Sequence, residues 1–139
     1  MCVTSKLAGK QSGRVSRALC EAASFAAEEL DVKVIGIFTA SGLMARRLSS
    51  LRPGQRIIAM TPRPEVRNEL SLVWGVESLI HQPCDDTDSL LRVGEKTLVE
   101  AGVVSQGETL VFMAGRLSGM GLSSSVSVYT VGEQVPRQD

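Results

Sequence analysis

Short apolar runs rich in β-branched residues alternate with segments of helical spacing along most of this chain. This alternation limits the possible folds strongly, because such runs are typical of strands buried on both faces of a sheet. We expect strands at residues 33–38, 56–61, 76–80, 109–114 and 125–131. Apolar residues at helical spacing predict helices at residues 15–30, 42–50, 64–73 and 86–102. The alternation predicts a three-layer α/β/α sandwich with a mostly parallel five-stranded sheet.

The last of these strands differs from the others. Residues 125–131 alternate polar and apolar side chains, which is typical of a strand at the edge of a sheet. About ten residues without helical pattern join it to the preceding strand, so the two can form an antiparallel hairpin. For this type of fold we expect the strand order 3-2-1-4-5. Residues 15–132 would then form one domain between two tails, 1–14 and 133–139.

The equal numbers of acidic and basic residues argue against a protein that binds nucleic acid or a membrane surface. Lys and Arg together number 15, as do Asp and Glu, whereas proteins that bind nucleic acid or membrane surfaces usually carry a basic excess. No apolar run is long enough to cross a membrane, and the first residues lack the apolar core of an export signal. Cys2, Cys20 and Cys84 fit neither a disulfide framework nor a zinc site. The sequence therefore predicts a cytoplasmic protein that binds neither nucleic acid nor membrane.

The turn after the first expected strand is the best candidate for a binding site. Thr39 and Ser41 supply hydroxyl groups there, and Gly42 lets the backbone bend tightly and a ligand approach closely. Hydroxyls beside the positive end of the following helix, with its free N–H groups, would suit a phosphate. In the alternative interpretation, Ser41 is only the N-cap of a surface helix. If strands one and four are neighbours, the glycine- and serine-rich loop at 115–124 meets this turn at the carboxyl edge of the sheet, where such folds bind ligands.

Other candidate chemistry is confined to one loop. His81, the single histidine, lies close to Cys84 in the sequence, and the two residues could form a nucleophile pair. Proximity in a loop does not establish the hydrogen bond that such a pair requires, so an ordinary loop histidine and thiol is the simpler interpretation. The segment Gly115–Gly121 lacks the Lys-Ser/Thr of a P-loop and the spacing of a dinucleotide fingerprint. We assign no catalytic residue and no metal ligand from the sequence.

An ordered set of motifs from Ser16 to Gly132 resembles the C-terminal domain of pyruvate kinase. An alanine-rich helix is followed by a strand ending in Thr-x-Ser-Gly, an Arg-Pro turn and a strand ending in Thr-Pro. A Trp-Gly-Val step, an Asp-Thr-Asp before the fourth helix and a glycine-rich loop before the last strand complete the set. These motifs lie at Ala22–Leu30, Phe38–Gly42, Arg52–Pro53, Ile58–Pro62, Val73–Val76, Asp86–Asp88 and Gly115–Ser125.

The resemblance implies a regulatory and oligomerisation domain of a glycolytic enzyme. In pyruvate kinases this domain binds an allosteric sugar phosphate or nucleotide and helps to assemble the tetramer. Carried over by position, the residues that would bind the effector phosphate are Thr39, Ser41, Gly42, Gly119 and Gly121.

Two positions depart from the family pattern and bear on the identity of the effector. The last hydroxyl of the first family loop falls on Met44 here, which removes one phosphate contact. An arginine that bisphosphate-binding members use falls near Leu90. The implied effector is therefore a sugar monophosphate or a nucleotide rather than fructose 1,6-bisphosphate.

The catalytic machinery of the family lies elsewhere. Pyruvate kinase chemistry, with its magnesium and potassium ions, belongs to a (β/α)8 barrel, and no motif of that barrel occurs in this chain. The resemblance therefore implies no cofactor in this domain and no catalysis by the chain alone. Its partners would be the effector, the catalytic barrel domain of the parent enzyme and further copies of itself. Two alternatives stay open: a purely structural relative with a decayed effector site, and a free-standing small enzyme that uses His81 and Cys84.

Overall fold

The computed structural model describes residues 9–84, 87–114 and 125–132. The helices in these residues are α1 (Gly9–Glu29), α2 (Leu43–Ser50), α3 (Pro64–Leu70) and α4 (Thr87–Glu100). The strands are β1 (Val34–Phe38), β2 (Arg56–Thr61), β3 (Val76–Ile80), β4 (Thr109–Ala114) and β5 (Ser125–Thr130). Helices and strands alternate from α1 to β4, as the sequence pattern predicts.

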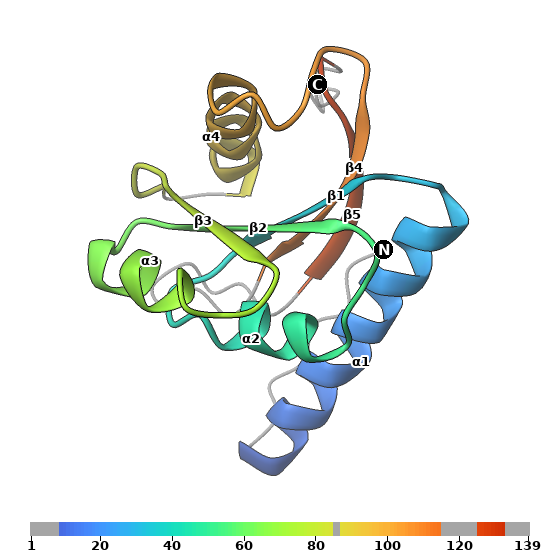
Figure 1. Ribbon diagram of the computed structural model, residues 1–139, viewed down its shortest axis with the longest axis vertical. Helices are drawn as coiled ribbons and strands as arrows, with labels where there is room; N and C mark the ends of the chain where they lie inside the picture. The colour runs from blue at the N-terminus through green and yellow to red at the C-terminus, as the bar shows by residue number, and fades with distance from the viewer. Residues whose placement is uncertain (1–8, 85–86, 115–124, 133–139) are drawn as a thin grey trace.

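The strands form one sheet in the order β3-β2-β1-β4-β5. β1 lies between β2 and β4 and is parallel to both, whereas β5 pairs antiparallel with β4. α1, α2 and α3 cover one face of this sheet, and α4 covers the other (Figure 1). The three-layer architecture, the strand order and the antiparallel last strand expected from the sequence are thus confirmed.

Each face of the sheet has its own apolar core. On the face of α1 to α3, Ala23 and Ala27 of α1 and Leu48 of α2 are fully buried. On the face of α4, the fully buried side chains include Phe38 of β1 and Leu98 of α4. All five residues of β1 are buried, because the strand lies at the centre of the sheet with helices on both sides.

A glycine inside α4 sets how closely that helix approaches the sheet. A Cβ atom at Gly94 would lie 2.4 Å from Cζ of Phe38, a separation that real Cβ atoms do not adopt. The ring of Phe38 in turn stacks on Phe112, with centroids 5.2 Å apart. The close approach of α4 to the sheet therefore explains why glycine, a residue of low helix propensity, stands inside this helix.

Two helix boundaries lie three or more residues away from the predicted ones. α1 begins at Gly9 rather than Val15, so residues 9–14 are helical and not part of a loose tail. Once a helix is nucleated, each further residue adds a hydrogen bond, which offsets the low propensity of the serine and glycines there. α3 ends at Leu70 rather than Val73, because the next turns tighten: the Val73 N–H donates to the Leu70 carbonyl at 3.0 Å.

α1, with 21 residues, is the longest helix in the described part of the chain. Its buried side is alanine-rich and its other side carries charged residues such as Arg17 and Glu21, whose exposed side chains lie 3.3 Å apart. None of the described helices combines the length and the apolar character needed to cross a membrane.

Candidate functional site

The Thr39–Gly42 turn lies at the carboxyl edge of the sheet, beside the end of a neighbouring strand. Phe38, the last residue of β1, is paired with Met60 of β2 and with Ala114 of β4. β4 ends at Ala114, directly beside the residue that precedes the turn. The two candidate residues of the second expected loop, Gly119 and Gly121, lie outside the described residues. The expected neighbourhood of strands one and four is confirmed.

Inside the turn, backbone amides are already bound by the side chains that precede them. The Gly42 N–H donates to Oγ1 of Thr39 at 2.8 Å. The Leu43 N–H donates to Oγ of Ser41 at a longer 3.3 Å. Thr39 is only 3% exposed, whereas Ser41 is exposed to solvent. The buried Thr39 therefore stabilises the turn from its interior side, and Ser41 presents its hydroxyl at the surface.

Gly42 allows the chain to pass from this turn into α2. Its φ angle is 85°, in the left-handed region that favours glycine. A Cβ atom there would also lie 3.1 Å from Cδ2 of Leu70, at the end of α3. The residue is thus constrained both by its own backbone and by the neighbouring helix.

The first turn of α2 offers backbone donors next to Ser41. The first α-helical bond of α2 runs from the Arg46 N–H to the Gly42 carbonyl, at 3.1 Å. By helix geometry, the preceding amides of Met44 and Ala45 have no acceptor within the helix. Together with the positive end of the helix dipole, these amides and the Ser41 hydroxyl are suited to an anion.

Met44, where the family pattern has a hydroxyl, belongs to the core. Its side chain is 4% exposed, and its Sδ lies 3.5 Å from Sγ of Cys20 on α1. Burial raises the pKa of the Cys20 thiol to about 11, so this cysteine stays protonated and unreactive at neutral pH. Position 44 therefore joins α1 to α2 and contributes no side-chain donor to the turn.

The arginines near the turn are engaged with carboxylates at the surface. Arg46 Nη2 lies 3.7 Å from Glu69 Oε2, and Arg63 Nε lies 2.9 Å from Glu65 Oε1. All four side chains are about half exposed, so each pair contributes little to stability. Neither arginine is held in place for a ligand at the turn.

His81 and Cys84 do not form the nucleophile pair considered from the sequence. His81 Nδ1 lies 2.7 Å from the carbonyl oxygen of Gln82, and the Cys84 thiol donates to the same oxygen at 3.3 Å. Since a carbonyl only accepts, Nδ1 is the protonated nitrogen. The other nitrogen, Nε2, has no hydrogen-bond partner, so neither nitrogen is placed to take a proton from the thiol. No pattern in the sequence indicates that this histidine is buried.

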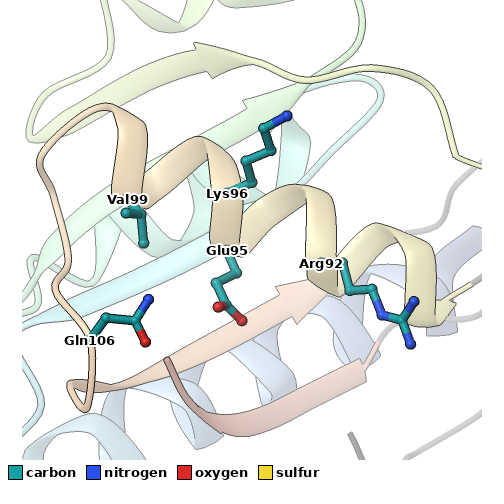
Figure 2. A pocket seen from close by; sticks show the side chains of 5 residues that line it. All are labelled: Arg92, Glu95, Lys96, Val99 and Gln106. Atoms are coloured by element: carbon teal, nitrogen blue, oxygen red, sulfur yellow. The ribbon is translucent and has the colours of Figure 1, made fainter. Parts of the chain in front are cut away.

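A hollow of about 220 Å³ lies along α4, on the side of the molecule away from α1 to α3. Arg92, Glu95, Lys96, Val99 and Gln106 line it. Figure 2 shows that Glu95 and Gln106 reach into the same space, whereas the Arg92 and Lys96 side chains point away from each other. Glu95 also accepts hydrogen bonds from the Tyr129 hydroxyl and, at 3.3 Å, from the Gly132 N–H. The carboxylate therefore ties the end of β5 to α4.

Trp74 does not belong to the buried core. It is 59% exposed, and the guanidinium of Arg52 lies 4.6 Å from its ring centroid.

Across residues 9–84, 87–114 and 125–132, no group of three His, Cys, Asp or Glu side chains is arranged to hold a metal ion.

Comparison with protein families gives one match that covers most of the chain. Residues 17–129 match the model of the pyruvate kinase alpha/beta domain. Pyruvate kinase of Staphylococcus aureus strain USA300 is 37% identical over 107 residues, which are 76% of this chain and 18% of that protein. The enzyme of the bovine strain RF122 is 36% identical over the same shares. The chain thus spans less than a fifth of the length of these relatives.

Solved structures show the same fold. A pyruvate kinase from Cryptosporidium parvum superimposes with a TM-score of 0.69 and 23% identity, covering 92% of this chain and 24% of that one. The same enzyme in complex with ADP gives a TM-score of 0.70 over the same shares.

Proposed function

The chain belongs to the family of the pyruvate kinase C-terminal α/β domain, and from this we propose that it is the regulatory and oligomerisation domain of such an enzyme. In this proposal it binds a phosphorylated effector, a sugar monophosphate or a nucleotide, at the Thr39–Gly42 turn. The chain has no catalytic activity by itself. The chemistry, with its magnesium and potassium ions, belongs to the catalytic barrel domain of the parent enzyme in the cytoplasm.

The observation that carries the proposal is the placing of the Ser41 hydroxyl beside the start of α2. Ser41 is exposed, and the Met44 and Ala45 amides follow it in a helical turn where they lack intrahelical acceptors. The buried Thr39 fixes Gly42 through its 2.8 Å hydrogen bond, so the turn needs little ordering when an anion binds. Gly119 and Gly121 complete the site in this proposal.

Isothermal titration with AMP and with a hexose monophosphate tests the effector role. We expect saturable binding to the intact chain, and Ser41→Ala should weaken it about tenfold, the effect of losing one hydrogen bond to a charged group. Ser50→Ala, at the other end of α2, is the matched control because Ser50 is also exposed and bonds only to the Arg47 carbonyl, at 2.6 Å. Equal affinity in the two variants would place the ligand elsewhere.

The burial of Met44 favours a second candidate, a purely structural relative whose effector site has decayed. A core methionine replaces the side-chain donor of the family pattern at this position. This candidate predicts no heat with any phosphorylated compound, although the chain would still associate with its partners. The titration therefore separates the two functions.

For self-association we propose the edge of the sheet at β5. Among the described strands it pairs only with β4, and its Val128 residue is 53% exposed. An exposed edge without lysine or proline is a ready template for pairing with a second copy. Sedimentation over a hundredfold range of concentration should show a dimer that Val128→Lys weakens. Leu72→Lys, at an 89% exposed site before β3, is the control that should leave it intact. A constant monomer mass would contradict this part of the proposal.

A further inference from the structure

His81 is buried at the carboxyl end of β3, and its hydrogen bond determines which ring nitrogen carries the proton. The residue is 6% exposed, and its Nδ1 lies 2.7 Å from the Gln82 carbonyl oxygen. This contact requires a proton on Nδ1, so the neutral ring carries a lone pair on Nε2. Nε2 is itself buried and makes no hydrogen bond. The neutral ring is therefore held by one hydrogen bond and by packing.

Among the described residues, the groups that meet the ring are apolar or uncharged. The Phe38 ring meets it edge-on, with centroids 5.9 Å apart, and Phe38 is in turn packed against Gly94 of α4. From β2, the Thr61 carbonyl accepts the backbone N–H of His81 at 3.1 Å. On its own segment, the Cys84 thiol donates to the same Gln82 carbonyl. No charged side chain of β1, β2 or α4 in the described residues affects the ring; burial lowers its pKa, and the Gln82 carbonyl partly opposes this.

A second proton on this ring would have no acceptor where the ring lies. It would place a charged N–H on Nε2, next to apolar atoms, and burying an unpaired charge is costly. Because Gln82 and Pro83 are exposed, the His81–Cys84 segment has solvent on its outer side into which the ring can turn. Protonation would then be relieved by moving the ring rather than by unfolding the sheet.

We propose that His81 is a pH-sensitive latch on the segment that leaves β3. With a neutral ring, the segment His81–Cys84 is closed against the sheet. With a protonated ring, the segment opens and uncovers the edge of Phe38. His81 and the proposed effector site contact different parts of the fold: His81 meets Phe38 of the core on the α4 side, whereas Gly42 of the turn packs against Leu70 of α3.

The direction of the pH dependence follows from the pKa of the His81 ring in the closed and in the open conformation. In the closed conformation burial lowers the pKa of His81 below the ordinary value of 6.5, whereas in the open conformation the ring is in water. The closed conformation is therefore fully favoured above about pH 6.5, and opening becomes easier as the pH falls from there towards the lowered pKa. Below the lowered pKa, no further change is expected.

Nuclear magnetic resonance tests the latch on the intact chain, since the single histidine gives a single ring signal. We expect a folded-state pKa below 6.5 and a protonated Nδ1. The protection of the His81 amide against hydrogen exchange should fall by up to about tenfold per pH unit below pH 6.5. The Thr39 amide, which donates to the Met60 carbonyl at 2.9 Å just after β1, is the matched control and should keep its protection.

His81→Asn separates titration from position, because an asparagine side chain can donate to the Gln82 carbonyl but cannot take up a proton. In this variant the protection at residue 81 should no longer depend on pH. The proposal is overturned if His81 titrates at 6.5 or above, if both amides lose protection together, or if the variant keeps the pH dependence. Should the variant fail to fold, the titration and the two amides of the unmodified chain decide the question alone.

Discussion

The two faces of the sheet bring their helices close in different ways. On one face, α1 approaches through several small side chains, Ala23 and Ala27 among them, each fully buried. On the other, α4 approaches at a single glycine, into whose space the Phe38 ring fits. The approach of α1 to the sheet is thus distributed over several small residues, whereas the approach of α4 depends on the missing Cβ atom of one residue. The α4 face should therefore be the one that a single added methyl group disrupts.

The Thr39–Gly42 turn and the His81–Cys84 segment differ in how well their polar groups are hydrogen-bonded. The Thr39–Gly42 turn, which packs against α3, binds its own amides through hydroxyl groups. The His81–Cys84 segment, on the α4 face, leaves one buried ring nitrogen without a partner. Buried polar groups without partners are costly, so we expect the first turn to be rigid and the second to open more readily.

Gly94→Ala should have the largest effect, because its Cβ atom would meet Phe38 at 2.4 Å and the ring is almost fully buried. Overpacking typically costs about 1–3 kcal/mol, and the 2.4 Å separation puts this substitution at or above the upper end of that range. The better helix propensity of alanine returns about 1 kcal/mol. We expect a net loss of about 2–3 kcal/mol in the free energy of unfolding, measured with denaturant.

Two further variants check that the contact itself is responsible. Gly54→Ala adds the same methyl group where no atom lies within 4 Å, and it should leave stability nearly unchanged. Phe38→Leu in the Gly94→Ala background should recover part of the loss, because the shorter side chain vacates the contested space. A Gly94→Ala variant as stable as the unmodified chain would show that the two faces are equally tolerant.

Gly42→Ala is the corresponding change on the face of α1 to α3, and its effect should be smaller. Its φ of 85° costs an alanine about 1–2 kcal/mol. The nearest atom, Cδ2 of Leu70 at 3.1 Å, is the end of a flexible side chain and can move away. Thermal and denaturant unfolding should thus place this variant between Gly94→Ala and the unmodified chain. If it lost more stability than Gly94→Ala, the comparison of the faces would be reversed.

Thr39→Val tests whether the turn is held by its hydroxyl group. The substitution leaves the buried volume almost unchanged but removes the acceptor of the Gly42 N–H. We expect a loss of about 1 kcal/mol in the free energy of unfolding and faster exchange of the Gly42 amide. Thr39→Ser keeps the acceptor and should keep the amide protected. Equal exchange in both variants would mean that the hydroxyl does not hold the turn.

The strands were predictable from the sequence because their signal is local. The bounds of β2, β3 and β4 agree with the prediction, since apolar runs of β-branched residues end at turn residues such as Pro62. The start of α1 was not predictable, because residues 9–14 lack apolar periodicity and are helical by extension of a helix anchored further along.

The position of the candidate turn was predictable from the sequence, but its internal contacts were not. The Thr-x-Ser-Gly pattern located the turn, yet only the structure shows that Thr39 is buried and bound to Gly42, while Ser41 is exposed. Met44 is buried against Cys20 of α1 and His81 against Phe38 of β1, and both of these partners lie far away in the sequence. Such long-range packing leaves no periodic signal in the residues themselves.

The central claim is that the Thr39–Gly42 turn binds a phosphate group, and amide chemical shifts during a titration with AMP test it most directly. The predicted result is a saturable shift of the Ser41, Leu43, Met44 and Ala45 amides in the unmodified chain, with Ser50 unaffected. Unchanged signals at these four amides at the highest AMP concentration, or shifts confined to another part of the chain, would contradict the claim.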